Sequence, residues 1–237
     1  MEMTRDTASA SLSHLANYPN LFVGPHSSHS CFAECLNCAL VKEYTIHDPV
    51  TNAHLFTAEE EANWLGLNCC SHLRSFNMSV RTTDGELCRF ERPWHCEGGG
   101  CYCCCCGDFF YQVLRVYGGQ DSERPGELLG QVEEQYAYCV SPTFKVMRAD
   151  DSVAFTIVKD QAYTLQMEIY EGSKRRRDEP VGSIAKLRGG DLAKGLHMSA
   201  APLAVNFPPT ADSSDRALLL GAAFLLDFVV LQHGLRG

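Results

Sequence analysis

Cysteines are the residues whose type and spacing most clearly suggest chemistry in this chain, which has thirteen of them. A hydrophobic core does not require adjacent thiols, since a buried cysteine packs as a small hydrophobe. The stretch CEGGGCYCCCCG nevertheless places six thiols within eleven positions, which predicts a chemical role. These residues are Cys96, Cys101, Cys103, Cys104, Cys105 and Cys106.

Three chemical interpretations of this run remain open. Thiols on a glycine-flanked loop are accessible to S-acylation, and two or more acyl chains give a stable membrane attachment that one chain does not. Zinc is the second interpretation, because the run contains C-x2-C spacings. The third is an inert or redox-reactive loop. The acylation candidates are Cys101, Cys103, Cys104, Cys105 and Cys106, and a closed zinc site would recruit Cys69, Cys70 and Cys96, or Cys31, Cys35 and Cys38.

The charge of the chain limits its partners. A net charge of -9 argues against a general nucleic-acid coat, which needs basic side chains to neutralise phosphates. One local exception is EGSKRRRDEP, in a predicted strand connection. Its basic residues form a solvated loop, an import signal or a contact for anionic lipid headgroups. Contact with an anionic surface would contribute about 1 kcal/mol of binding free energy per basic residue. They are Lys174, Arg175, Arg176 and Arg177.

Other features bear on the compartment and on enzymatic activity. The N-terminal stretch has no apolar segment long enough for a signal peptide, so we expect reduced thiols that face the cytosol and no secretion. The sequence has no G-x-S-x-G, P-loop or H-E-x-x-H motif. Its nine histidines are scattered and are interpreted as structural or solvated. No catalytic residue is predicted.

From residue 42 onward, short extended runs between turn signals predict an antiparallel β protein. A first hairpin is expected around the turn at Pro49 to Asn52, and a second around Asp84-Gly85, which tolerates a positive φ. Further strands are predicted over 109–117, 132–140, 143–148, 153–158 and 163–169, the first of them covered on both faces. This spacing suggests a sandwich or barrel. Residues 1–40 are expected to be loosely ordered, ahead of a barrel domain over 41–237.

The last apolar run, ALLLGAAFLLDFVVL, predicts a helix over 216–232 with Ser213, Ser214 and Asp215 as N-cap candidates. Its apolar residues cannot share one stripe at 3.6 residues per turn, so it is a core helix or a membrane span. At about 25 Å it is shorter than a hydrocarbon core of about 30 Å, which favours burial, in the interior of a closed barrel. The expected core or membrane residues are Leu218, Leu219, Phe224, Leu225, Asp227 and Phe228.

Asp227 lies in the middle of this apolar run. An unpaired buried charge is costly, because the carboxylate loses its hydration and gains no partner. Asp227 is therefore predicted to have a hydrogen-bond partner.

Several motifs occur in one order along residues 41 to 235. They are Cys69-Cys70 after TAEEE, F-x-R-P-x-x-C at Phe90 to Cys96, the multi-cysteine run, VGSIAK at Val181 to Lys186, Phe207-Pro208, and LLGAAFLLDF at Leu219 to Phe228. In this order and spacing they resemble the motifs of the phospholipid scramblase family, of which the chain would be a divergent member.

The resemblance implies a fold and an activity. The fold is a tubby-like closed antiparallel β-barrel around a central C-terminal helix. The activity is energy-independent movement of phospholipids between membrane leaflets, switched on by calcium, in a protein anchored by palmitoylated cysteines. We therefore expect attachment to the cytosolic face of a membrane, the plasma membrane being the first choice. A single helix offers no polar groove across a bilayer, so translocation would require homo-oligomers, bilayer distortion or departure of the helix from the barrel.

In this family, calcium is assigned to an acidic segment just ahead of the final helix. The matching stretch here, SAAPLAVNFPPTAD, keeps the apolar positions but has one carboxylate. Calcium prefers several hard oxygen ligands, so we expect poor affinity. The corresponding residues are Ser199, Leu203, Val205, Phe207, Thr210 and Asp212.

Two other functions remain open. One is a soluble or peripheral β-barrel adaptor that binds lipid headgroups or proteins and moves nothing. The other is a barrel stabilised by zinc.

Overall fold

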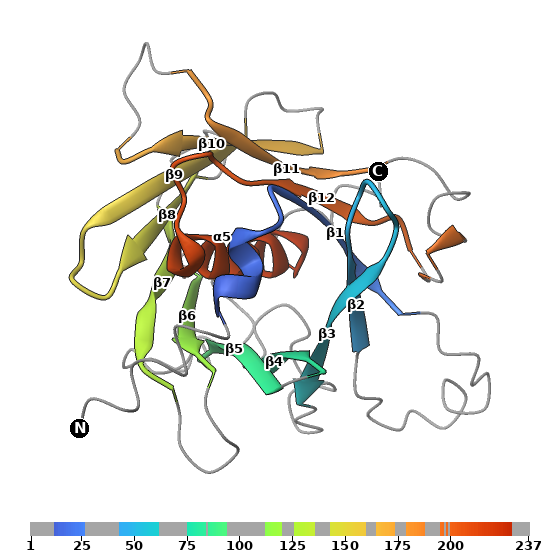
Figure 1. Cartoon of the computed structure of the whole chain (residues 1–237). Helices are drawn as coiled ribbons and strands as arrows, with labels where there is room; N and C mark the ends of the chain where they lie inside the picture. Colours follow the sequence, from blue (N-terminus) through green and yellow to red (C-terminus); the bar gives the residue numbers. More distant parts are fainter. Residues whose placement is uncertain are drawn as a thin grey trace, which may run out of the picture.

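The chain folds as a closed β-barrel around a helix. The computed structural model describes residues 12–26, 43–61, 75–83, 85–93, 112–119, 126–135, 143–159, 165–173, 179–187, 195–196, 198 and 200–228. These residues form twelve strands and helix α5 (Ser213–Leu226). Figure 1 shows α5 surrounded by the strands. The structure confirms the predicted fold class, a closed antiparallel barrel around a buried C-terminal helix.

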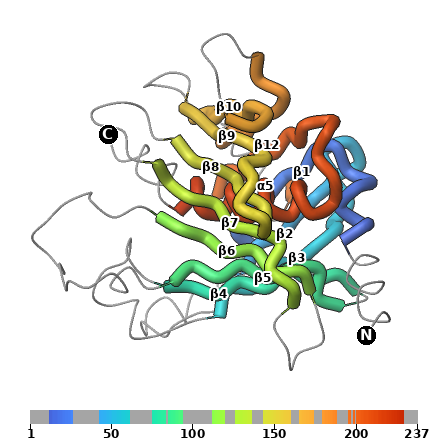
Figure 2. Tube along the Cα trace, turned by 90° about the vertical axis from the view of Figure 1, so that its left-hand side faces the viewer, coloured from blue at the N-terminus to red at the C-terminus, as the bar shows by residue number. Residues whose placement is uncertain are grey.

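Each strand pairs antiparallel with two neighbours, in the order β1-β12-β11-β10-β9-β8-β7-β6-β5-β4-β3-β2, and β2 pairs with β1 to close the barrel. Figure 2 shows β6, β7 and β8 side by side along one wall. The strands are β1 (Asn20–Pro25), β2 (Glu43–His47), β3 (His54–Glu61), β4 (Phe76–Thr82), β5 (Gly85–Arg92), β6 (Val113–Gly118), β7 (Leu128–Gln135), β8 (Thr143–Arg148), β9 (Val153–Lys159), β10 (Gln166–Glu171), β11 (Gly182–Lys186) and β12 (Leu203–Asn206).

The first two predicted hairpins are confirmed. β2 and β3 pair around the turn at 48–53, where Asn52 has a φ of 58°. Such a left-handed conformation is more accessible to asparagine than to most residues. β4 and β5 pair around the Asp84-Gly85 turn, where Gly85 has a φ of 147°, and Asp84 itself lies outside the described residues.

The strand predicted over 109–117 corresponds to β6, and the prediction that it is covered on both faces is wrong. In β6, Leu114 and Val116 point into the core and are fully buried, whereas Arg115 and Tyr117 face outward and are partly exposed. The outer face carries polar contacts, and the Tyr117 hydroxyl donates to Glu91 Oε2 at 2.9 Å. A barrel filled by its own helix needs apolar side chains on one face of each strand, so β6 alternates.

The barrel starts earlier in the chain than the predicted boundary at residue 41. β1 lies between β2 and β12 and closes the barrel, and residues 12–16 form a helical turn whose Leu12 and Leu15 are buried. β1 is recognisable in the sequence only as the short apolar run Leu21 to Val23, because its partner β12 lies far along the chain. Periodicity also failed to predict β11 and β12, and the strands predicted over 132–140 and 163–169 are β7 and β10, displaced by a few residues.

Helix α5 begins three residues before the predicted start. The N-cap is Asp212, whose side chain accepts a hydrogen bond from Asp215 N at 2.8 Å, so the candidates Ser213, Ser214 and Asp215 were wrong. Gly221 allows the helix to approach the wall, since a Cβ there would lie 3.0 Å from Val116 and 3.1 Å from Leu114. The last predicted residues, 229–232, lie outside the described residues.

Candidate functional site: the two ends of the barrel

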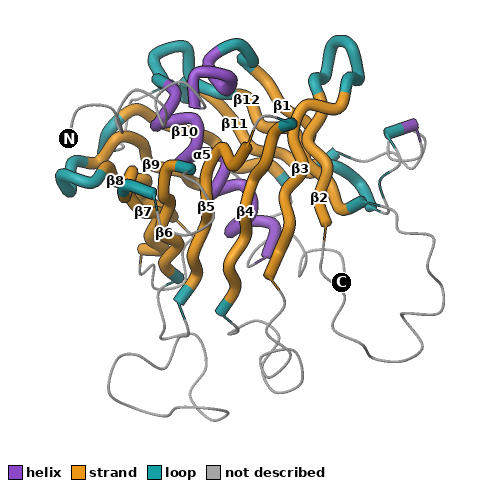
Figure 3. Tube along the Cα trace, turned by 60° about the horizontal axis from the view of Figure 1, so that its bottom comes forward, coloured by secondary structure: helices purple, strands orange, loops and turns teal. Residues whose placement is uncertain are grey.

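Strand direction gives the barrel two distinct ends. Because all pairings are antiparallel, odd-numbered strands finish at the end where α5 finishes, and even-numbered strands finish at the end where α5 begins. We call these the helix-finish end and the helix-start end. Figure 3 shows α5 running between the strands from one end toward the other.

Apart from Cys88, every cysteine lies in a connection at one end of the barrel. Cys88, on β5, is fully buried, and burial raises the pKa of its thiol far above the ordinary value. All other cysteines lie in the connections β1–β2, β3–β4, β5–β6 and β7–β8, each of which joins strand ends at the helix-finish end. The candidates Cys69, Cys70, Cys96, Cys101 and 103–106 themselves lie outside the described residues.

A buried ion pair stands at the helix-finish end. Lys186 Nζ, on the last residue of β11, donates to Asp227 Oδ1 at 2.7 Å, and their side chains are 9% and 12% exposed. Asp227 follows the last turn of α5 and so lies where the barrel opens. The prediction that Asp227 has a hydrogen-bond partner is confirmed.

A buried arginine lies at the same end. The Arg92 guanidinium, at the end of β5, donates to the Gln112 side chain and stacks over the Phe228 ring, 4.5 Å from its centroid. Arg92 is 1% exposed, and its described contacts include a neutral amide and an aromatic face. Glu134 Oε2 accepts from Gln112 N at 3.2 Å and connects this cluster to β7.

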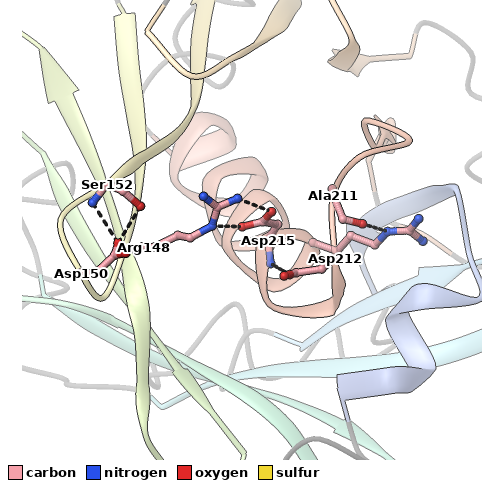
Figure 4. Close-up of polar contacts among 7 residues, drawn as sticks. Arg148, Asp150, Ser152, Ala211, Asp212 and Asp215 are labelled. Carbon is pink, nitrogen blue, oxygen red and sulfur yellow. Dashed lines mark hydrogen bonds and ion pairs between the residues drawn. The ribbon is translucent and has the colours of Figure 1, made fainter.

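The helix-start end is held by a different ion pair (Figure 4). Arg148, at the end of β8, donates from Nε and Nη2 to the two carboxylate oxygens of Asp215, at 2.9 and 2.8 Å. Asp215 is buried in the first turn of α5, where the helix dipole favours a negative charge, and the Arg148 side chain is 46% exposed. The hydrogen bond to Asp215 raises the pKa of Arg148.

Arg216 ties the N-terminal residues to this end. Its Nη1 donates to the carbonyl oxygens of Leu15, Ala16 and Tyr18 at 2.9 to 3.0 Å. Three acceptors for one guanidinium satisfy the carbonyls at the end of the helical turn over 12–16. This contact joins residues 15–18 to the first turn of α5 at the helix-start end.

The helix residues singled out from the sequence form the core. Leu218, Leu219 and Leu225 are at most 1% exposed, and Phe224 packs edge-on against Tyr44, with 5.3 Å between ring centroids. Phe228 is partly buried and packs on Phe76. The apolar helix faces are therefore covered by the barrel wall.

No helix formed by the residues that the structure describes has the length and apolar character needed to cross a membrane.

The segment over 199–212, which matches the family's calcium segment, contributes side chains to the core and the N-cap of α5. Leu203, Val205 and Phe207 are buried in the core, and the backbone of β12 is paired with β1 and β11. Asp212 supplies the only carboxylate of the matched residues, and it caps α5. These donors do not fit a calcium site, which needs several hard oxygens free to converge. Thr210 is exposed, Ser199 lies outside the described residues, and poor calcium affinity stays a prediction.

Within the described ranges, no group of three or more His, Cys, Asp or Glu side chains is arranged to hold a metal ion. The zinc interpretation depends on cysteines outside those ranges and is untested.

The connection that contains the basic run joins strand ends opposite those joined by the cysteine connections. Residues 174–177 follow Gly172 in the connection between β10 and β11, which joins strand ends at the helix-start end. They lie outside the described residues, and headgroup contact stays a prediction.

Sequence reasoning missed a group of histidines on the outer wall. His47 and His54 lie opposite each other across the β2–β3 hairpin, with ring centroids 5.4 Å apart, and His26 lies beside Glu43 at the end of β1. The available signal was the position of His47 and His54 on either side of the predicted turn at Pro49 to Asn52.

These features define a class of protein: a closed antiparallel barrel that encloses its own apolar C-terminal helix. The scramblase family model matches residues 12–233, nearly the whole chain. The chain therefore belongs to the scramblase family.

Individual relatives are distant in sequence. Human phospholipid scramblase 2 is 24% identical over 181 residues, which cover 76% of this chain and 57% of that protein. Human phospholipid scramblase family member 5 is 24% identical over 186 residues, covering 77% of this chain and 64% of that protein. Bovine phospholipid scramblase 2 is 26% identical over 185 residues, covering 75% and 57%. The chain thus matches less than two thirds of the length of these relatives, and no solved structure matches it significantly.

Proposed function

We propose that this protein moves phospholipids between the leaflets of a membrane, in both directions and without an energy source, while attached through acylated cysteines. Membership of the scramblase family, over residues 12–233, is the observation that carries the proposal. The cysteine run between β5 and β6 supplies the attachment. Phospholipid is the proposed substrate, and the cytosolic face of the plasma membrane is the proposed location.

Attachment would act at the helix-finish end. Acylation of Cys101 and 103–106 would hold the β5–β6 connection at the bilayer, and the strand ends of that connection lie where α5 finishes. Each buried methylene of a palmitoyl chain contributes about 0.8 kcal/mol, and one chain alone binds only marginally. Five adjacent candidates make double acylation easy to achieve, so we expect a stable attachment with the barrel end-on to the membrane.

The basic run favours a competing orientation. Lys174 to Arg177 would add about 1 kcal/mol per residue at an anionic surface, about as much in total as a few methylenes of an acyl chain. Their connection joins strand ends at the helix-start end. A barrel that stands end-on to the membrane therefore cannot bring both the acylated cysteines and the basic run to the bilayer. We therefore propose that acylation determines the attachment and that the basic run faces away from the bilayer.

The lipid path cannot run through the barrel of this conformation. α5 fills the interior with side chains that are nearly all buried, and ion pairs hold both of its ends. A polar headgroup crossing a bilayer needs a polar surface to replace its hydration. We propose that lipids cross at the outer surface of the attached protein, through bilayer distortion or between the subunits of a homo-oligomer.

The same closed interior favours a second candidate function. A barrel that contains its helix and exposes no interior path suits a membrane-attached adaptor that binds lipid headgroups or proteins and moves nothing. The two functions share the attachment and differ in transport.

Transport is tested with purified, acylated protein in vesicles that carry a fluorescent phospholipid in both leaflets. Chemical reduction of the outer-leaflet label bleaches about half of the signal in protein-free vesicles, and bleaching beyond that level reports translocation. We expect such additional bleaching, with little dependence on calcium because the donors around Asp212 fit calcium poorly. Bleaching equal to that of empty vesicles would reject transport and leave the adaptor.

Attachment is tested separately in cells. Replacing Cys101 and 103–106 by Ser should release the protein from membranes. Replacing Cys31, Cys35 and Cys38 by Ser is the matched control at the same barrel end and should leave the protein attached. Replacing 174–177 by Gln tests the competing orientation, and loss of binding in that variant alone would contradict attachment by acylation. Elemental analysis of protein purified without chelator decides whether zinc is bound.

A further inference from the structure

The two ends of the barrel differ in what lines their interior. At the helix-finish end, Arg92 and Lys186 are the last residues of β5 and β11, and both are bonded to polar partners. At the helix-start end lie Phe56, near the start of β3, and Phe207 and Ala211, between β12 and α5. These three belong to the main apolar core and are at most 6% exposed. Apolar side chains at the open end of a barrel would face water unless another part of the chain covered them.

Residues 12–18, which we call the N-terminal latch, cover this end. Leu12 and Leu15 of the latch are 5% and 0% exposed, and they belong to the same core cluster as the leucines of α5. Ser13 and His14, which lie between them, are exposed. Figure 1 shows the latch as the blue turn beside α5. The latch therefore has an apolar face that packs on the barrel core and a polar face in water.

The latch contacts strands that do not pair with each other. At one end of the latch, the Tyr18 ring packs edge-on against Phe56 of β3, with 6.1 Å between ring centroids. At the other end, Leu12 Cδ1 lies 3.9 Å from the position of a Cβ on Gly118, the last residue of β6. β4 and β5 lie between β3 and β6 in the barrel wall. The latch thus extends along the helix-start end instead of continuing one strand.

Arg216, in the first turn of α5, holds the latch through the latch backbone. Its Nη1 donates to the carbonyl oxygens of three latch residues at 2.9 to 3.0 Å, and its Nε donates to Ala211 O at 3.2 Å. The guanidinium also lies over the Phe207 ring, 5.6 Å from its centroid. Release of the latch would remove three acceptors from a partly buried guanidinium, which costs free energy. The positions of the latch and of the first turn of α5 are therefore coupled.

The latch is attached to the barrel differently from the strands. Each strand shares backbone hydrogen bonds with two neighbours. In the latch, by contrast, Asn17 N donates to His14 O and Tyr18 N donates to Leu15 O, so these bonds close within the latch itself. A short segment held by a few apolar side chains opens at a smaller free-energy cost than the whole barrel. The latch is therefore suited to open while the strands stay paired.

We propose that the N-terminal latch controls how firmly α5 is held in the barrel. In the closed state the latch covers the helix-start end, and Arg216 ties it to the first turn of α5. When the latch leaves, the first turn of α5 is released, whereas the last turn stays bound through the buried pair of Asp227 and Lys186. The helix therefore loosens from one end. This inference does not rest on the proposed function, because it holds whether or not lipids are moved.

The test is hydrogen–deuterium exchange of the whole chain, read on peptides covering the latch, both ends of α5, and β6 to β9. Leu15→Asp places a carboxylate in the apolar core and should release the latch. Exchange over the latch and the first turn of α5 should rise by on the order of a hundredfold. The last turn of α5 and β6 to β9 should keep the protection of the parent chain. Unchanged exchange in the first turn, or a loss spread evenly along α5, would overturn the proposal.

Further variants separate latch release from general destabilisation. His14→Asp adds the same carboxylate at an exposed latch position and should exchange as the parent chain does. Arg216→Met keeps the apolar stem and removes every donor, so exchange over the latch and the first turn of α5 should rise by about tenfold or more. Arg148→Met is its control, because Arg148 bonds to Asp215, and it should leave exchange over the latch unchanged. If β6 to β9 lose protection together with the latch in Arg216→Met, the latch opens only with the whole barrel and the proposal is wrong.

Discussion

The two ends of the barrel secure the same helix by different physical means. At the helix-start end, Asp215 is bound by an arginine that is half exposed, and Asp212 caps the helix. At the helix-finish end, Lys186 and Asp227 are both largely buried. An exposed partner can be replaced by water when it is removed, whereas a buried partner cannot. The helix-finish end, which also joins the cysteine connections, should therefore be the more sensitive to loss of one charge.

The largest expected effect is at Asp227. Asp227→Ala leaves Lys186 buried without its partner and should lower the free energy of unfolding by about 3 kcal/mol. Urea denaturation followed by circular dichroism measures this change. Replacing both residues, as Lys186→Met with Asp227→Leu, should recover most of the loss. A double variant as unstable as Asp227→Ala would show that the pair itself, and not the uncompensated charge, provides the stability.

The corresponding change at the helix-start end should be smaller. Arg148→Ala removes the bidentate partner of Asp215, but the Arg148 side chain is half exposed, so water can take its place, and the helix dipole still favours the carboxylate. We expect a loss of about 1–2 kcal/mol in the same urea experiment. Arg115→Ala is a control, because Arg115 pairs with Glu91 at 3.9 Å on the exposed outer wall. If Arg148→Ala is more destabilising than Asp227→Ala, the comparison between the two ends is wrong.

Loss of the N-cap of α5 should have the next smaller effect on the free energy of unfolding. Asp212→Ala removes the acceptor for Asp215 N and should cost about 1 kcal/mol, whereas Asp212→Ser keeps an acceptor and should cost less. Because the segment ahead of α5 is the one matched to calcium, thermal denaturation of both variants with and without calcium is informative. A calcium-dependent stabilisation that disappears with Asp212→Ala would show that this carboxylate binds the ion.

The smallest effect concerns the β8–β9 turn next to Arg148. Hydrogen bonds from the Ser152 side chain and backbone lower the pKa of the exposed Asp150 carboxyl. A lowered folded-state pKa gives stability that is present above the unfolded value and is lost as the pH falls through the folded value. Ser152→Ala should therefore raise the pKa of Asp150, as measured by NMR titration, and weaken only the acid limb of the stability curve. An unchanged pKa would mean that the backbone bond alone is responsible.

The sequence predicted local features where neighbouring residues set them. The hairpins around Asn52 and Gly85 were predictable because turn chemistry and alternation act over a few residues. The burial of α5 was predictable because its apolar residues surround the helix axis. The cap was assigned wrongly because four adjacent residues, from Asp212 to Asp215, are all acceptable N-caps, and only the backbone conformation selects one.

Other features depend on contacts between distant parts of the chain. β1 is a strand because β12, which follows it by about 180 residues, and β2 lie on either side of it. The sequence determined that Asp227 needs a partner, through the cost of a buried charge, and tertiary structure decided that the partner is Lys186. The sequence likewise contained the cysteine run and the basic run, but strand direction assigned their connections to opposite ends. Antiparallel closure fixes the end at which each connection lies, and local composition does not carry that information.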